Sequence, residues 1–196
     1  MLGKTAGGLY WMFRSLERAE NTARLVEAGF RIALTRSTNA EAEWKSVIVT
    51  SAARAAYEAK YQHYDSESVV HFLLQDADNP SSVLSVIKSA RDNARLVRTA
   101  LTTEVWTSVN ETWMVLTKLL GAPIPQTELP AALATIRAQS AVVRGALHGT
   151  MLRNDIYDFC RLGTFIERMD STARIIDVKY YSLLPAPSFV GSRLDN

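Results

Sequence analysis

The sequence predicts an all-α protein: a single helical bundle of six to seven helices whose long N- and C-terminal helices are pseudo-equivalent. Apolar residues recur at steps of three and four over nearly the whole chain, which is the period of an amphipathic helix. No alternating strand pattern bounded by hairpin turns is present. We expect helices over about residues 5–36, 41–62, 66–75, 82–101, 103–120, 130–150 and 155–184.

Polar and turn residues delimit the first three expected helices. The first is broken by Ser37-Thr38-Asn39, and the second ends before Asp65. Asp65 resembles an N-cap, with Glu67 in the first turn of the third helix. A turn over 76–80 ends that helix. The apolar stripe of the first helix consists of Leu9, Met12, Leu16, Ala19, Ala23, Val26 and Phe30.

Caps and prolines delimit the later helices. Ser81 or Ser82 is expected to cap the fourth helix, and Thr102 or Thr103 the fifth. Gly121 fits the position just after a helix end, and the two prolines that follow it make continuation unfavourable. A second pair of prolines ends the last helix. The sequence therefore predicts helices throughout, joined by short turns.

Composition bounds the class of protein. The 196 residues fit one domain, and we assign 1–187 to the helical domain and 188–196 to a flexible C-terminal tail. The 22 basic and 20 acidic residues nearly cancel, so no nucleic-acid partner is expected. The single cysteine, Cys160, excludes an internal disulfide. Because no secretion signal or long apolar run is present, we expect a cytoplasmic protein without a membrane partner.

Two segments at opposite ends of the chain match at a constant offset of 150 residues. Residues 16–27 read LERAENTARLVE and residues 166–177 read IERMDSTARIID, with five identical positions. A weaker copy at 91–98 keeps Ala-Arg-Leu-Val but lacks the Glu-Arg start. A period this long is not a solenoid. We therefore expect two pseudo-equivalent helices that pack together.

Both repeated helices place acidic and arginine residues beside an apolar stripe when drawn at about 100° per residue. Glu20 and Arg24, and likewise Asp170 and Arg174, are i,i+4 pairs in the favourable orientation. If the two stripes face the core together, several carboxylates and arginines converge. The stripe expected to face the core consists of Leu16, Ala19, Ala23 and Val26 in the first helix, and of Ile166, Met169, Ala173 and Ile176 in the last.

This convergence has several interpretations. It is a structural ion-pair network between the terminal helices, or a polar pocket for a small or peptidic ligand. An enzyme site with Glu17 or Glu167 as general base is the third, although paired arginines favour ionised carboxylates. No metal is expected, because arginines compete for the carboxylate oxygens and His63, His71 and His148 share no ligand spacing.

Three blocks, in order along almost the whole chain, carry a further signal: residues 9–24; residues 79–82 and 90–98 with Trp106 and Asn110; and residues 159–163 with 166–174. Together they resemble the bacterial alpha-E domain family, formerly a domain of unknown function. The chain departs from the family pattern at Asp92 and Met169, and it lacks the usual Arg after Gly163.

The resemblance implies an all-helical domain encoded in gene clusters with an ATP-grasp amidoligase-like protein and a transglutaminase-like protein. We therefore expect an accessory or substrate-handling component of a peptide- or amide-bond-forming system, with those two proteins as partners and no cofactor. A homodimer is a further expectation, and the alternatives are a stand-alone enzyme and a purely structural scaffold or dimerisation protein. The residues expected to line a polar pocket are Glu17, Arg18, Glu20, Arg24, Arg91, Asn93, Arg95, Glu167, Arg168, Asp170 and Arg174.

Overall fold

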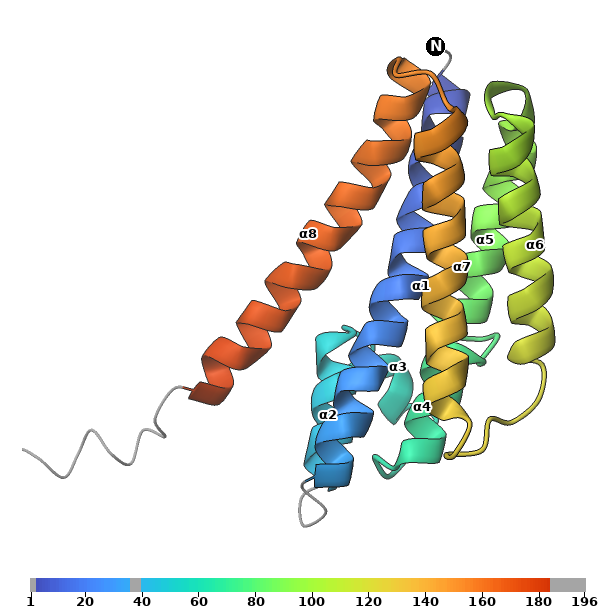
Figure 1. The fold of residues 1–196 in the computed structure, drawn as a ribbon. Coiled ribbons are helices and arrows are strands. Elements are labelled where there is room, and N and C mark those ends of the chain that lie inside the picture. Colours follow the sequence, from blue (N-terminus) through green and yellow to red (C-terminus); the bar gives the residue numbers. More distant parts are fainter. Residues whose placement is uncertain (1–2, 36–39, 184–196) are drawn as a thin grey trace, which may run out of the picture.

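The structure, a computed structural model, describes residues 3–35 and 40–183 (Figure 1). These residues contain no strand, which confirms the predicted all-α class, and they form eight α-helices rather than six to seven. The predicted tail, 188–196, lies outside the described residues. The helices are α1 (Gly3–Thr35), α2 (Ala40–Thr50), α3 (Arg54–Glu58), α4 (Ser66–Leu74), α5 (Val83–Leu96), α6 (Thr103–Leu119), α7 (Leu129–Thr150) and α8 (Asp155–Leu183).

Helix α1 occupies the centre of the bundle. It packs against α5, α7 and α8, and also against α2 and α4, while α6 packs against α5 and α7 on the outside (Figure 1). Because helices surround α1, its predicted apolar stripe is buried: Leu16, Ala19, Ala23 and Val26 all belong to the core. The stripe expected to face the core in the first helix is therefore confirmed.

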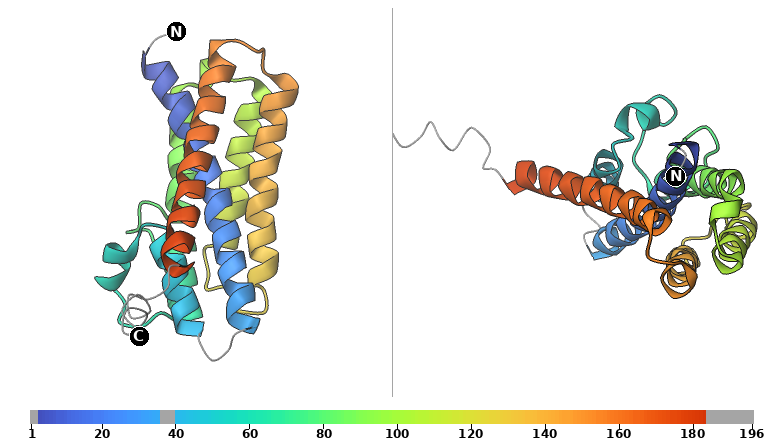
Figure 2. Two further views of the ribbon diagram at one scale, coloured as in Figure 1. Left: turned by 90° about the vertical axis from the view of Figure 1, so that its left-hand side faces the viewer. Right: turned by 90° about the horizontal axis from the view of Figure 1, so that it is seen from above.

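Helix α8 packs against α1, as the repeat predicts, and runs in the same direction. Both helices begin at the same end of the bundle (Figures 1 and 2). Along its length α8 diverges from α1, so that its C-terminal end lies away from the bundle (Figure 1). The contact between the repeated helices is therefore concentrated in the N-terminal part of α8.

The apolar stripe of α8 does not face the core, and this prediction was wrong. Met169 is 65% exposed and Ile176 63% exposed, Ala173 is exposed and Ile166 is only partly buried. The α1-facing side uses ion pairs and a close backbone approach instead, so small and polar residues replace apolar ones there. The buried residues on this side are Cys160, Gly163, Thr164 and Glu167.

The helix predicted over 41–62 is divided into α2 and α3. Ala52 between them has a φ of 56°, in the left-handed region that ends a helix. The Ser51 hydroxyl donates to the Ile48 carbonyl at 2.7 Å, a local bond that competes with continued helix. Because no glycine or proline marks this turn, the sequence pattern did not indicate it.

The predicted N-caps of three helices are confirmed. Asp65, Ser82 and Thr102 each accept a hydrogen bond from the backbone N–H three residues later. Helix α5 ends at Leu96, earlier than expected, because the chain tightens into a 3₁₀ turn at Arg98–Ala100.

Gly163→Ala should lower the free energy of unfolding by about 1–3 kcal/mol, because overpacking at a helix contact costs that much. A Cβ at this position would overlap the backbone carbonyl oxygen of Tyr10 in α1. Gly145→Ala in α7 is the matched control, since a Cβ there meets no neighbouring atom, and it should stabilise by about 0.5–1 kcal/mol. Denaturant unfolding of both variants measures the difference, and equal effects would contradict a close α1–α8 approach.

Candidate functional site

The Glu-Arg dipeptides of the two repeats form reciprocal ion pairs between α1 and α8. Arg168 donates to Glu17 from Nε at 2.8 Å and from Nη2 at 3.2 Å. Arg18 donates to Glu167 from Nε at 2.5 Å and from Nη2 at 3.0 Å. Both pairs are bidentate, the geometry that a planar guanidinium matches to a carboxylate. We call these four residues the Glu–Arg clamp.

The two carboxylates are the buried members of the clamp. Glu17 and Glu167 are each 4% exposed, whereas Arg18 and Arg168 keep part of their surface in water. Burying a carboxylate costs several kcal/mol, and removing one partner of such a pair leaves that cost uncompensated. The clamp therefore favours one arrangement of α1 and α8, in which each glutamate meets the other helix's arginine.

A second arginine of α1 also binds Glu167. Arg14 donates from Nε to Glu167 at 2.6 Å and from Nη1 to the Tyr10 hydroxyl at 3.0 Å, and its guanidinium lies 5.1 Å from the centre of the Trp11 ring. Sequence reasoning missed Arg14 because it lies outside the repeat. The available signal was its spacing of four from Arg18, which puts both arginines on one helix face.

Two arginines of α1 keep Glu167 ionised. Burial by itself would raise the pKa of Glu167, but the guanidinium groups of Arg18 and Arg14 overcome this and hold the pKa below its usual range. The pKa of Arg168 is raised, chiefly by its hydrogen bond to Glu17. Glu167 therefore stays ionised at neutral pH and is not a carboxyl group that exchanges protons.

A parallel set of ion pairs joins α1 to α7. Glu20 accepts hydrogen bonds from Arg144 at 2.5 Å and from Arg24 at 2.7 Å, and these two arginines hold its pKa down against the opposing effect of burial. Glu27 accepts from Arg137 at 2.7 Å. Sequence reasoning found neither arginine of α7, because α7 carries no copy of the repeat.

The later charges of the α8 repeat connect α8 to the turn after α2. Arg174 donates to Asp170 at 2.7 Å, as the i,i+4 spacing predicts. The same guanidinium donates to the backbone carbonyl of Ser51 at 3.2 Å. The unexpected break between α2 and α3 thus supplies an acceptor for a residue of the repeat.

The central block of expected pocket residues lies elsewhere. Arg91 donates to Asn110 of α6 at 2.8 Å, and its guanidinium stacks 4.1 Å from the centre of the Trp113 ring. Asn93 donates to a carbonyl of its own helix, and Arg95 is exposed. Arg91 therefore stabilises the α5–α6 contact, and none of the three residues is brought to the Glu–Arg clamp.

Two hollows open beside the clamp, between α1, α2 and α8. The apolar hollow measures about 260 Å³ and is lined largely by Leu25, Ile32, Val47 and Ile175, with Arg24 and Arg168 also in its wall. The polar hollow measures about 220 Å³. Its polar wall includes Arg18, Thr22, Glu167, Asp170, Ser171 and Arg174.

Asn21 lies in the wall shared by the two hollows. It lines both of them, and its side-chain Nδ2 is buried without a hydrogen-bond partner. Buried amide groups in proteins are almost always paired, so an unpaired donor at a cavity wall is one that a ligand or a water satisfies. Asn21 was not among the expected pocket residues, although it lies inside the repeat.

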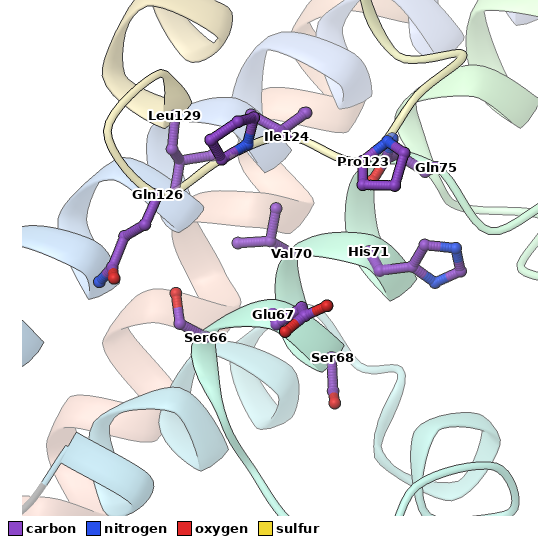
Figure 3. A pocket seen from close by; sticks show the side chains of 11 residues that line it. Ser66, Glu67, Ser68, Val70, His71, Gln75, Pro123, Ile124, Gln126 and Leu129 are labelled. Atoms are coloured by element: carbon purple, nitrogen blue, oxygen red, sulfur yellow. The ribbon is translucent and has the colours of Figure 1, made fainter.

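A larger hollow of about 480 Å³ lies away from the clamp, between α4 and the loop that precedes α7 (Figure 3). Its floor is apolar at Val70 and Leu129, and Ser66, Glu67 and His71 border it. None of its lining residues belongs to the repeat. It therefore has no connection with the charged motif.

Other reactive groups contribute little to this site. Among the described residues, no group of three or more His, Cys, Asp or Glu side chains is placed to hold a metal ion. Burial raises the pKa of the Cys160 thiol to about 12, which leaves it un-ionised. No described helix combines the length and the apolar character that crossing a membrane requires.

The comparisons with known proteins give one family match. A family model described as a predicted alpha-helical domain with a conserved ER motif, Alpha-E, matches residues 1–195, so the chain belongs to the Alpha-E family. Glu-Arg occurs at 17–18 and at 167–168, which are the two halves of the clamp. No curated protein matches the chain, and no solved structure matches it.

Glu167→Gln should lower the free energy of unfolding by about 1–3 kcal/mol, because a buried amide cannot satisfy the two arginines that the carboxylate serves. Glu58→Gln is the control, since Glu58 forms a solvent-exposed pair with Arg54 at 2.8 Å, and exposed pairs contribute little to stability. Denaturant unfolding distinguishes the two. An E167Q variant as stable as E58Q would contradict a stabilising clamp.

Stability should also fall in acid. Glu20 and Glu167 have folded-state pKa values below the ordinary 4.5, so the unfolded chain binds more protons around that pH. These two carboxylates stabilise the folded state fully when the pH is above their unfolded-state pKa. The stabilisation is lost as the pH falls through their lower folded-state pKa. Thermal unfolding measured from pH 7 to pH 3 should show this, and the E20Q/E167Q double variant should have a smaller slope. An unchanged slope would argue that these carboxylates are not responsible.

Proposed function

We propose that this Alpha-E protein is a substrate-handling helical component of a peptide- or amide-bond-forming system, acting with an ATP-grasp amidoligase-like protein and a transglutaminase-like protein. In this proposal the chain holds a peptidic ligand in the hollows between α1 and α8 and presents it to its partners. One observation carries the proposal: the Glu–Arg clamp borders two adjoining hollows of different polarity, with an unpaired Asn21 amide between them.

A peptidic ligand suits both hollows. Peptides combine amide groups with apolar side chains, and the apolar hollow offers a place for such a side chain beside Leu25 and Val47. The polar hollow offers Asn21 for an amide carbonyl and the Thr22 hydroxyl for a further hydrogen bond. Each hollow is smaller than the roughly 300 Å³ at which small-molecule pockets begin, and together they exceed it.

The electrostatics favour ligand handling over catalysis by this chain. A general base works best with a pKa near the operating pH, and the arginines around Glu167 move its pKa the other way. The Cys160 thiol is buried and un-ionised, so it is a poor nucleophile. We therefore assign the bond-forming step to the partners. The proposal places the complex in the cytoplasm, where an ATP-grasp ligase has ATP.

A purely structural role is the second candidate. The motif carboxylates Glu17, Glu20, Glu167 and Asp170 all pair with arginines, which is what an internal joint requires. A structural joint gives no role to the hollows or to the unpaired Asn21 amide. The two candidates differ in whether the hollows matter when the clamp is intact.

Filling the hollows should abolish function without loosening the clamp. Ser171 lines both hollows, and Ser171→Phe places a large side chain in them. We expect co-purification of the chain with the ATP-grasp amidoligase-like protein and a change in that protein's ADP release when the chain is added. S171F should lose the effect on ADP release. Arg174→Ala should lose it as well, because it removes one charged side chain from the polar wall.

Ala134→Phe is the matched control, because Ala134 is exposed on α7 away from both hollows. It should behave as the unaltered chain, and thermal unfolding of all three variants checks that they are folded. Absence of a complex together with unchanged ADP release would overturn the proposed function. Full activity of a folded S171F variant would favour the structural role.

A further inference from the structure

The apolar hollow carries an excess of positive charge where it borders the Glu–Arg clamp. Among the described residues, the ion pairs of the clamp and of the neighbouring Glu20 join three glutamates to a larger number of arginines. These residues are Glu17, Glu20 and Glu167 with Arg14, Arg18, Arg24, Arg144 and Arg168. Glu43, which also lines the hollow, is engaged in an interaction of its own. Positive charge remains in excess when Glu43 is included.

Two of these arginines line the apolar hollow and keep hydrogen-bonding capacity. The guanidinium of an arginine donates from Nε, Nη1 and Nη2. Arg24 uses Nε and Nη2 on Glu20, and Arg168 uses the same two nitrogens on Glu17. Within the described residues neither Nη1 has a hydrogen-bond partner, and the two side chains are 58% and 49% exposed. Each arginine therefore has N–H groups left for a ligand.

The two guanidiniums lie at the same end of the hollow. Arg24 binds Glu20 and Arg168 binds Glu17, and these glutamates are less than one helical turn apart on α1. The charge of Glu20 also acts on Arg168, whose pKa it helps to raise. The wall continues away from the clamp as far as Ile32, largely through apolar residues. The hollow is therefore cationic at one end and largely apolar along the rest.

We propose that this hollow binds the free C-terminal carboxylate of a peptide whose last residues are apolar, with the carboxylate on Arg24 and Arg168. The proposal rests on the proposed function and specifies which part of a peptide the hollow holds. Charge complementarity selects this occupant, because a C-terminus carries its negative charge directly beside an apolar side chain. The unpaired amide of Asn21 lies in the same wall and supplies a donor for a peptide carbonyl.

The length of the hollow fits a short terminal segment. From Asn21 to Ile32 the wall follows about three turns of α1, or about 16 Å. An extended peptide covers that length in about five residues. A fatty acid shares the carboxylate and the apolar chain but has no amide group for Asn21. A free amino acid adds an ammonium group, which the excess positive charge repels. A peptide C-terminus therefore matches the hollow better than either.

Calorimetric titration of the full chain with acetyl-leucyl-alanyl-leucine tests the proposal. This acid should bind, and its C-terminal amide should bind about tenfold more weakly, because the charge-assisted hydrogen bonds to arginine are lost. Octanoate should also bind more weakly than the peptide acid, because it lacks amide groups. Absence of binding, equal affinity for the acid and the amide, or octanoate binding as tightly as the acid would overturn the proposal.

Arg24→Gln should weaken binding of the peptide acid and reduce the difference in affinity between the acid and the amide. Arg31→Gln is the matched control, since Arg31 is an exposed arginine of α1 that pairs with Glu27 four residues earlier and lines neither hollow. An R24Q variant that binds the acid as tightly as R31Q would overturn the proposal. Thermal unfolding checks that both variants are folded, and the comparison of acid with amide requires no variant.

Failure of this proposal is distinguishable from failure of the proposed function. The titrations use the chain alone, whereas the proposed function is tested by complex formation and ADP release with the ATP-grasp amidoligase-like protein. Equal affinity for the acid and the amide would overturn the carboxylate assignment and leave peptide handling in place. Tight binding of the acid without any complex would overturn the partner assignment and leave the carboxylate site in place.

Discussion

Two buried carboxylates that each need an arginine from the opposite helix hold this structure together. Glu17 depends on Arg168 and Glu167 depends on Arg18, so neither α1 nor α8 buries its glutamate alone. The pairs fix the two helices parallel and in one register, which is also the register that brings the backbone of α8 at Gly163 close to α1. A shift by one residue would rotate the glutamates out of reach of the arginines.

The polar nature of this contact has two consequences for the rest of α8. The apolar half of the repeat, which α1 uses to form the core, is free to face outward in α8. Beyond the clamp α8 diverges from α1 (Figure 1), and the two hollows are lined on α8 by residues between 167 and 178. The candidate binding region therefore follows from the choice of ion pairs over apolar packing.

Sequence reasoning predicted the all-α class and most helix ends, because caps, prolines and a 3.6-residue period are local signals, and it predicted the pairing of the repeated helices from their matching sequences. It failed where the structure depends on distant partners. The stripe through Met169 and Ile176 looks like a core face in sequence, and only the reciprocal clamp shows that Glu167 faces α1 instead. Arg144 and Asn21 gave no signal, because a partner in α7 and an unpaired amide are visible only in three dimensions.

The reciprocal dependence of the two helices is the central claim, and a double-mutant cycle on Glu17 and Arg168 tests it most directly. Free energies of unfolding for E17Q, R168A and the double variant give the coupling energy between the two side chains. The clamp predicts a coupling of about 1–3 kcal/mol, as for hydrogen-bonded charges that share a buried contact. Additivity within about 0.3–0.5 kcal/mol would contradict it, because independent residues show no more coupling than that.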